Sequence, residues 1–176
     1  MATTTKRAVD EFIRSAPEEI RGRFEYFDGG WHEKPRGRIS GWRHNNLSAY
    51  LVVALERRGV KASLDVITQL PIGEERHPDV LVVGPRNSNQ PGDGEYRGVP
   101  DLVLELLSEG NAGAYLERKR ESYRLAGVRH YWLVRLASDT VEPAVLTAQP
   151  DGQEDYVFGE PFPLFPLEAL PLPADL

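Results

Sequence analysis

One segment of this sequence, residues 101–107, constrains the fold more than any other. It reads DLVLELL and is almost continuously apolar, which is typical of a β-strand that is covered on both faces. Side chains alternate along a strand, so Val103 and Glu105 share one face while the leucines at even positions fill the other. An amphipathic helix is expected next, over residues 112–126, and Gly127 provides its end. This pattern predicts a sheet strand that lies between two covering layers.

The rest of the chain adds a second helix and further strands. Apolar positions recur at helical spacing over residues 40–58, and an Asp-Gly-Gly turn at residues 28–30 predicts a β-hairpin. Two main helices against six or seven strands indicate a mixed α/β (α+β) domain, with one sheet flanked by helices. The other expected elements are a short helix at residues 8–14, strands at 62–70, 79–83, 129–136, 140–147 and 155–158, and a loop at 85–98.

We expect a single domain over residues 1–176, without internal repeats. Its expected parts are an N-terminal extension with a short helix (1–23), a core (24–147) and an acidic, Pro-rich C-terminal segment (148–176). The Pro-rich end of this last segment, from residue 161, is expected to be extended along the domain or partly loose.

Charge is distributed unevenly along the chain. The 21 Lys and Arg residues and 27 Asp and Glu residues give a net charge of -6, which by itself disfavours nucleic acid as a partner. However, residues 141–176 contain seven carboxylates and no Lys or Arg, while residues 1–140 carry a net charge of +1. The acidity therefore does not exclude nucleic acid. The lack of a basic surplus predicts weak, salt-sensitive DNA binding.

Several classes of protein are disfavoured by composition. The chain has no cysteine, which excludes disulfides, thiolate metal sites and a cysteine nucleophile. The first twelve residues are polar and charged, so we expect no secretory signal. No apolar run approaches the roughly 18 residues that a membrane span requires. We therefore expect a cytoplasmic protein without a membrane partner.

Three ionisable residues occupy positions where a packed core disfavours charge. Glu105 lies in the middle of an apolar strand, and a buried carboxylate is costly unless it is paired or binds a cation. Lys119 is the only charged residue on the helix face that should contact the sheet. Asp79 follows Pro78 at the start of another apolar strand. Two carboxylates and a lysine can form a magnesium site for phosphodiester hydrolysis, in which the lysine stabilises charge on the phosphate.

A structural explanation of the same residues stays open. Glu105 and Lys119 could form a buried ion pair, and Asp79 could cap a turn. His44 lies on the core-facing stripe of its predicted helix, where packing or capping competes with a catalytic role. Asp101 shares a strand face with Glu105, so it either supports the site or marks the exposed start of the strand.

A family resemblance runs through these positions. Its motifs are HPDVLVV at residues 77–83, VPDLVLELLS at 99–108, Lys119 with Tyr123, and AGVRHYWLV at 126–134. In order and spacing they resemble the Uma-two family of restriction endonucleases. The Asp-Gly hairpin and His44, at the opening of the first main helix, agree with the same family. The resemblance covers most of the chain, roughly residues 24–146.

The resemblance implies a PD-(D/E)XK nuclease fold, with a restriction-endonuclease-like core: a central mixed β-sheet flanked by helices and an N-terminal hairpin. Asp79 matches the first metal-binding aspartate and Glu105 matches the second acidic ligand, with magnesium (or manganese) as the metal. At the position two residues after the glutamate, where the superfamily usually has a lysine, this chain has Leu107. The resemblance implies that Lys119 on the following helix supplies that lysine instead. The backbone carbonyl of Leu106 is a further ligand by the same analogy.

The sequence thus predicts a magnesium-dependent endonuclease that hydrolyses DNA. The catalytic candidates are Asp79, Glu105, Lys119 and His44. Two alternatives stay open: a catalytically inactive nuclease-fold module that binds nucleic acid or protein, and an enzyme for another phosphodiester. A homodimer is a further expectation, because Trp31, Trp42 and the Pro/Phe-rich tail are apolar groups that need cover.

Overall fold

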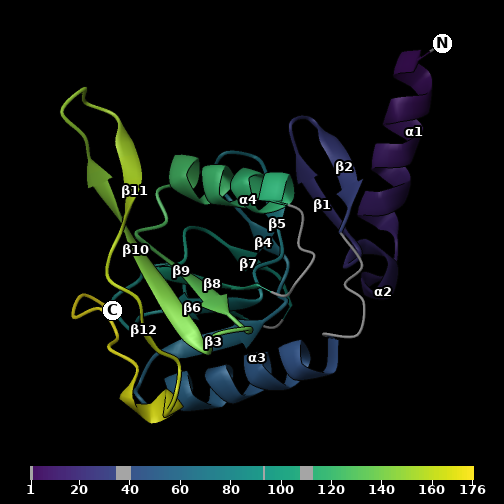
Figure 1. The fold of residues 1–176 in the computed structure, drawn as a ribbon. Coiled ribbons are helices and arrows are strands. Elements are labelled where there is room, and N and C mark those ends of the chain that lie inside the picture. Colours follow the sequence, from purple (N-terminus) through teal and green to yellow (C-terminus); the bar gives the residue numbers. More distant parts are fainter. Residues whose placement is uncertain (1, 35–40, 93, 108–112) are drawn as a thin grey trace.

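The computed structural model describes residues 2–34, 41–92, 94–107 and 113–176 (Figure 1). Its larger β-sheet has seven strands in the order β11-β10-β9-β8-β6-β3, with β12 paired to β10. The strands are β3 (Lys61–Leu64), β6 (Val80–Val83), β8 (Leu102–Leu107), β9 (His130–Arg135), β10 (Thr140–Ala148), β11 (Glu154–Phe158) and β12 (Phe162–Pro163). β8 and β9 are parallel and the other pairs are antiparallel. The predicted mixed sheet is therefore confirmed.

The two main helices cover opposite faces of this sheet (Figure 1). They are α3 (Gly41–Glu56) and α4 (Gly113–Ala126). The predicted first residues of these helices, 40 and 112, lie outside the described residues. Leu102, Leu104 and Leu106 of β8 belong to the main hydrophobic core together with leucines of α3. Val103 packs on the other side of the sheet, in a cluster with Tyr123 of α4. The predicted alternation is confirmed, and it leaves Glu105 on the side of α4.

A second, five-stranded sheet corrects the prediction of a single sheet. Its order is β2-β1-β5-β4-β7. The strands are β1 (Phe24–Phe27), β2 (Gly30–Glu33), β4 (Thr68–Gln69), β5 (Glu75–Arg76) and β7 (Tyr96–Arg97). Three of them have only two residues, too few for a periodic signal, and β7 lies within the predicted loop at 85–98. The predicted strand at 62–70 is divided at Asp65, whose φ is +46°, and its two halves join different sheets.

The N-terminal hairpin is confirmed as β1 and β2. Asp28 and Gly29 have φ values of +50° and +69°, the left-handed conformation that an Asp-Gly turn provides. Two helices precede the hairpin, α1 (Ala2–Ser15) and α2 (Glu18–Arg21). α1 begins earlier than predicted and ends before Pro17 as expected. It lies beside β2, and only its N-terminal end projects away from the two sheets (Figure 1). None of the described helices is long and apolar enough to cross a membrane.

The acidic segment 148–176 contributes to the packed core. Leu164 and Leu170 are buried and belong to the same cluster as the leucines of α3. The short 3-10 helix η1 (Leu167–Ala169) lies against α3, and Arg58 donates a hydrogen bond to the Leu170 carbonyl. The described end of the chain is therefore packed on the domain rather than loose.

Candidate active site

Glu105 points from β8 toward α4, where two side chains hold its carboxylate. Lys119 Nζ donates to Glu105 Oε2 at 2.8 Å, and the Tyr123 hydroxyl donates to Oε1 at 2.9 Å. Lys119 and Tyr123 are four residues apart and therefore lie on one face of the helix. Glu105 and Lys119 are each only 4 % exposed. The structure thus brings the predicted glutamate and the predicted lysine together.

Asp79 immediately precedes β6 and lies beside Glu105. The antiparallel register pairs Val80 with Leu104, and continuing it by one residue sets Asp79 opposite Glu105. The backbone N–H of Leu106 donates to Asp79 Oδ2 at 2.7 Å, which fixes this carboxylate at the strand ends. The Asp79 side chain is 23 % exposed, so it lies nearer to solvent than Glu105.

His44 joins the site from the first turns of α3. Its Nε2 atom lies 3.2 Å from Asp79 Oδ2, and its side chain is only partly buried. The sequence left open that His44 only packs in the core. Its partial exposure and its contact with Asp79 do not fit that explanation. The contact fits a residue that orients the Asp79 carboxylate.

Glu25 of β1 is a site residue that the sequence analysis missed. It is fully buried. Glu25 Oε1 accepts from the His77 backbone N–H at 2.9 Å and lies 3.6 Å from Lys119 Nζ. Its Oε2 accepts from the Tyr115 hydroxyl at 2.6 Å. The sequence did contain one indication, a carboxylate within the aromatic strand FEYF. However, the sequence does not show which face of the hairpin packs against the rest of the domain.

Arg76 of β5 is a second site residue that the sequence analysis missed, and it pairs with Glu25. Arg76 Nη1 lies 3.1 Å from Glu25 Oε2, and Arg76 Nη2 donates to Ser122 Oγ at 2.5 Å. The guanidinium carbon lies 3.8 Å from the centre of the Phe27 ring, a cation–π contact. This buried arginine ties the second sheet to α4 and holds Glu25 next to Lys119.

Asp101 lies at the start of β8 and has a different set of partners. Its Oδ2 accepts from the Gly84 backbone N–H at 2.8 Å and from Asn87 Nδ2 at 2.9 Å. These bonds hold the loop that follows β6. The sequence left two explanations of Asp101 open, a supporting role in the site or a position at the start of the strand. These contacts favour the second explanation.

The pKa values of the three carboxylates of the site are shifted in different directions. Burial raises the pKa of Glu105 to about 8. The negative charges of Asp79 and Glu25 raise this pKa further, whereas the positive charge of Lys119 acts to lower it. Burial also acts to raise the pKa of Asp79, but the His44 hydrogen bond and the charge of Lys119 outweigh it, so the value is lowered. In the same way, Lys119 and Arg76 overcome burial and lower the pKa of Glu25.

The pKa values of Lys119 and His44 are both raised above their ordinary values. Burial acts to lower the pKa of Lys119, but the charges of Glu105 and Glu25 outweigh it and raise the pKa well above its ordinary value. The hydrogen bond to Asp79 raises the pKa of His44, although burial opposes this. Lys119 is therefore an ammonium group that donates hydrogen bonds, not a base that accepts a proton.

The donor set fits a hard divalent cation. Magnesium prefers oxygen ligands and usually takes one or two carboxylates, with water and substrate phosphate in its other positions. Asp79 and Glu105 supply two carboxylates from neighbouring strands. The pKa of Glu105 is raised mainly by burial and further by the charges of Asp79 and Glu25, and a bound cation would favour its ionised form. Among the described residues, no group of three or more His, Asp or Glu side chains forms a ready-made metal site. Asp79 and Glu105 therefore fit a cation whose remaining ligands are water and substrate.

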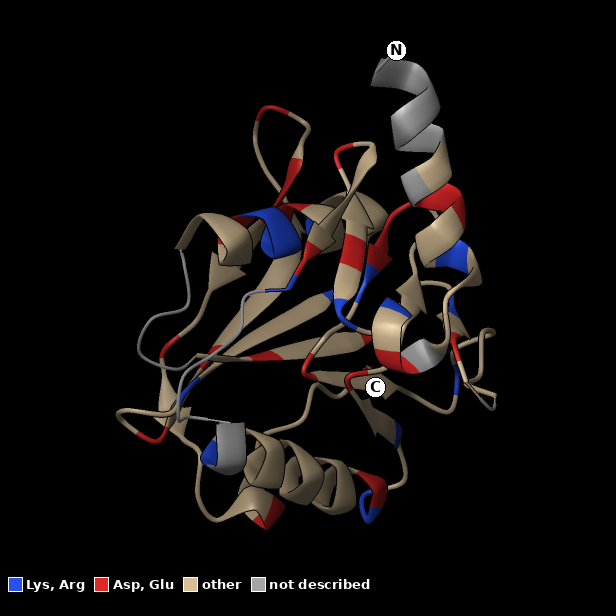
Figure 2. Ribbon diagram, turned by 90° about the vertical axis from the view of Figure 1, so that its right-hand side faces the viewer, with Lys and Arg blue, Asp and Glu red and all other residues tan. Residues whose placement is uncertain are grey.

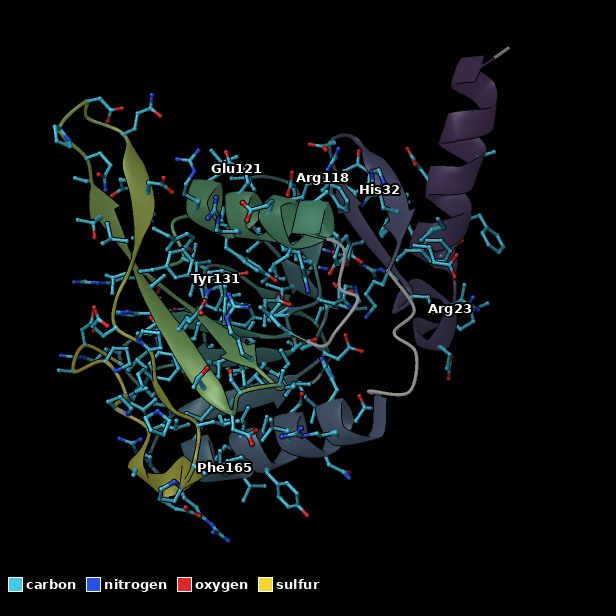
Figure 3. All side chains as sticks on the ribbon, in the orientation of Figure 1. Arg23, His32, Arg118, Glu121, Tyr131 and Phe165 are labelled. Atoms are coloured by element: carbon cyan, nitrogen blue, oxygen red, sulfur yellow. The ribbon has the colours of Figure 1, made fainter. Side chains whose placement is uncertain are left out.

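The outer edge of the site lies between α4 and the hairpin, where Arg118 and His32 approach each other (Figure 3). The Phe27 ring stacks on His32 with 4.0 Å between ring centroids, and Arg118 lies 5.7 Å from the Phe27 ring and pairs with Asp28. Acidic and basic segments are interspersed over the part of the ribbon that the structure describes, without a continuous basic stripe (Figure 2). This distribution agrees with a limited electrostatic attraction for DNA.

Comparisons with known proteins agree with this architecture. The family profile described as "Uma2: Putative restriction endonuclease" matches residues 9–172. A crystal structure described as "a putative nuclease belonging to DUF820" from Anabaena variabilis ATCC 29413 has a TM-score of 0.59 and 20 % sequence identity. The match covers 85 % of this chain and 82 % of that chain. None of the curated proteins matches the sequence. The predicted restriction-endonuclease-like fold is confirmed.

Proposed function

This chain belongs to the Uma2 family, and from that membership we propose that it is a divalent-metal-dependent endonuclease that hydrolyses phosphodiester bonds in DNA. The family and the fold support a nuclease. The metal, the DNA substrate and the roles of individual residues are inferred from the side chains described above.

Asp79 and Glu105 are the residues that would hold magnesium or manganese, and the backbone carbonyl of Leu106 is a third candidate ligand. When bound, the metal lowers the pKa of a water molecule and offsets negative charge on the phosphate. His44 positions Asp79 through the 3.2 Å contact between Nε2 and Oδ2. His44 thereby keeps one carboxylate turned toward the cation position.

Lys119 donates hydrogen bonds to the reacting phosphate or to the attacking water. Its raised pKa keeps it cationic, so it stabilises the negative charge that develops on the phosphate oxygens. Glu25 and the His77 carbonyl, at 3.6 Å and 2.8 Å from Nζ, hold the ammonium group in place. Glu25 is therefore a positioning residue in this proposal.

The observation that carries the proposal is the convergence of four chain segments on one charged cluster. β1, the start of β6, β8 and α4 each deliver one ionisable side chain, namely Glu25, Asp79, Glu105 and Lys119. A single buried ion pair needs only two such groups. Asp79 and Glu105 lie opposite each other on neighbouring strands, which places two carboxylates where one cation can bind both.

A plasmid-nicking assay tests this function. Wild-type protein with Mg²⁺ or Mn²⁺ should relax supercoiled DNA, and a chelator should stop the reaction. Glu105→Gln and Lys119→Met should lose the activity, whereas Glu117→Gln, an exposed position on the same helix as Lys119, should retain it. Equal nicking by wild type and Glu105→Gln would contradict the proposal.

A specific observation favours the alternative of a binding module without catalysis. Both oxygens of Glu105 already accept hydrogen bonds from Lys119 and Tyr123, as in a closed structural ion pair. On this alternative, fluorescence anisotropy should detect DNA binding that survives Glu105→Gln and Lys119→Met, without cleavage by any variant.

A further inference from the structure

An apolar groove lies on the outer side of α3, against the C-terminal segment. It has a volume of about 750 Å³, and its lining includes Tyr50 and Val53 of α3 and Phe165 of the C-terminal segment. These side chains are 65 %, 47 % and 52 % exposed. Figure 3 shows Phe165 at the surface beside α3. Large apolar groups gathered in one exposed groove are typical of an interaction surface rather than of scattered surface residues.

The groove carries one charge of each sign. Arg57, which directly follows α3, and Glu168 of η1 both line it, and both are exposed. Within the described part of the chain, neither forms an ion pair. An apolar centre with unpaired opposite charges at its edge has the composition of a protein contact surface. A nucleic acid would instead require a surplus of basic groups.

We propose that this groove binds a second copy of the same chain. In a two-fold contact the same patch serves both partners, so an exposed ring of one copy can enter the hollow of the other. In the proposed arrangement Arg57 of each copy faces Glu168 of the other, and the symmetry makes these two contacts equivalent. One patch thus supplies both an apolar contact and two equivalent ion pairs, which is the charge complementarity that a homodimer needs.

This surface differs from the one that the sequence suggested for a homodimer. Trp31 is partly covered in the structure, with the Tyr26 ring at 5.3 Å and the Arg14 guanidinium carbon at 5.6 Å from its ring. The Trp42 side chain lies outside the described residues. Phe165 of the tail lines the groove, and α3 supplies the other half of its lining.

The inference is independent of the proposed chemistry, although the two meet on α3. His44 lies near the start of this helix and contacts Asp79, whereas Tyr50 and Val53 lie further along it. A dimer through α3 joins two complete copies of the site in one particle. Mass, not cleavage, is therefore the readout that tests it.

Sedimentation velocity over a range of micromolar concentrations gives the first test. Wild type should sediment as a dimer at the upper concentrations, and Val53→Asp should remain monomeric. Leu125→Asp is the matched control, because Leu125 is also a largely exposed aliphatic residue on a helix, outside the groove. A wild-type protein that stays monomeric, or a Val53→Asp variant that dimerises like wild type, would overturn the proposal.

A charge exchange gives the second test and does not depend on how Val53→Asp folds. Arg57→Glu and Glu168→Arg should each weaken the dimer, because like charges then face each other across the interface. A mixture of these two variants should recover it as a heterodimer. In the mixed pair the new carboxylate at position 57 faces the new guanidinium at position 168, and the unchanged Arg57 faces the unchanged Glu168. Failure of the mixture to dimerise above the level of either variant alone would overturn the inferred pairing.

Discussion

Lys119 Nζ lies between two buried carboxylates, 2.8 Å from Glu105 Oε2 and 3.6 Å from Glu25 Oε1. In the proposed enzyme, a cation at Glu105 competes with Lys119 for the same carboxylate. Glu25 then remains to hold the ammonium group. Stability, protonation and metal binding are therefore linked through this one lysine.

Replacing Lys119 should destabilise the protein strongly. Lys119→Met leaves Glu105 buried without its cationic partner, and breaking a buried pair on one side costs about 3–5 kcal/mol. Lys61→Met, at an exposed position on β3, should change the free energy of unfolding by less than about 0.5 kcal/mol. Urea unfolding followed by circular dichroism measures both, and equal losses in the two variants would contradict the buried pair.

The stability of the metal-free protein should fall as pH rises from about 4.5 to about 8. The folded-state pKa of Glu105 is raised above its ordinary value of 4.5, so its contribution to stability is complete at low pH and is lost through that range. The lowered pKa values of Asp79 and Glu25 have the opposite sign, and their contributions are lost in acid. Thermal unfolding at pH values from about 5 to 9 measures the effect, which should level off above the folded-state pKa of Glu105. Glu105→Gln should abolish this decrease, and an unchanged decrease in this variant would assign it to another group.

Glu25→Gln should separate positioning from metal binding. The variant keeps the shape of Glu25 but removes the charge that faces Lys119 and Arg76, so we expect cleavage to fall by about 10–100-fold. Metal affinity should stay close to that of wild type, because Asp79 and Glu105 are retained. Steady-state nicking rates and calorimetric metal titration measure the two effects, with Glu117→Gln as the control. Loss of metal binding would instead make Glu25 a ligand.

The C-terminal segment should be necessary for stability. Leu164 is fully buried in the main core, so Leu164→Ala should cost about 2–5 kcal/mol of unfolding free energy. Leu125→Ala, at a largely exposed position on α4, provides the comparison and should cost much less. Chemical denaturation measures both. A loss for Leu164→Ala no larger than that for Leu125→Ala would show that the segment is not part of the core.

The part of the site that lies on long, periodic elements could be predicted from the sequence. The alternation of β8 and the helical spacing of α4 placed Glu105 and Lys119 on facing surfaces, and these two side chains meet in the structure. Asp79 was recognisable because it begins an apolar strand. The chemistry of two carboxylates and a lysine suggested a magnesium site. The family motifs then predicted which position each carboxylate matches, and these metal roles stay a prediction.

Glu25 and Arg76 could not be predicted in the same way. They lie on strands of four and two residues, and the register between these strands pairs Tyr26 with Glu75, residues far apart in the sequence. Short strands give no reliable period, and long-range pairing is set by the whole fold. The packed C-terminal segment was uncertain for a related reason. Its many prolines interrupt any periodic pattern, so the sequence does not show that a few of its leucines enter the core.

The central claim is that Asp79 and Glu105 bind a divalent metal ion. Isothermal titration of Mg²⁺ or Mn²⁺ into wild type, Glu105→Gln and Glu117→Gln at a pH above about 8 tests it most directly, because Glu105 is then ionised. We predict saturable binding by wild type and Glu117→Gln, and loss of binding in Glu105→Gln. The absence of binding by wild type, or equal binding by all three proteins, would contradict the claim.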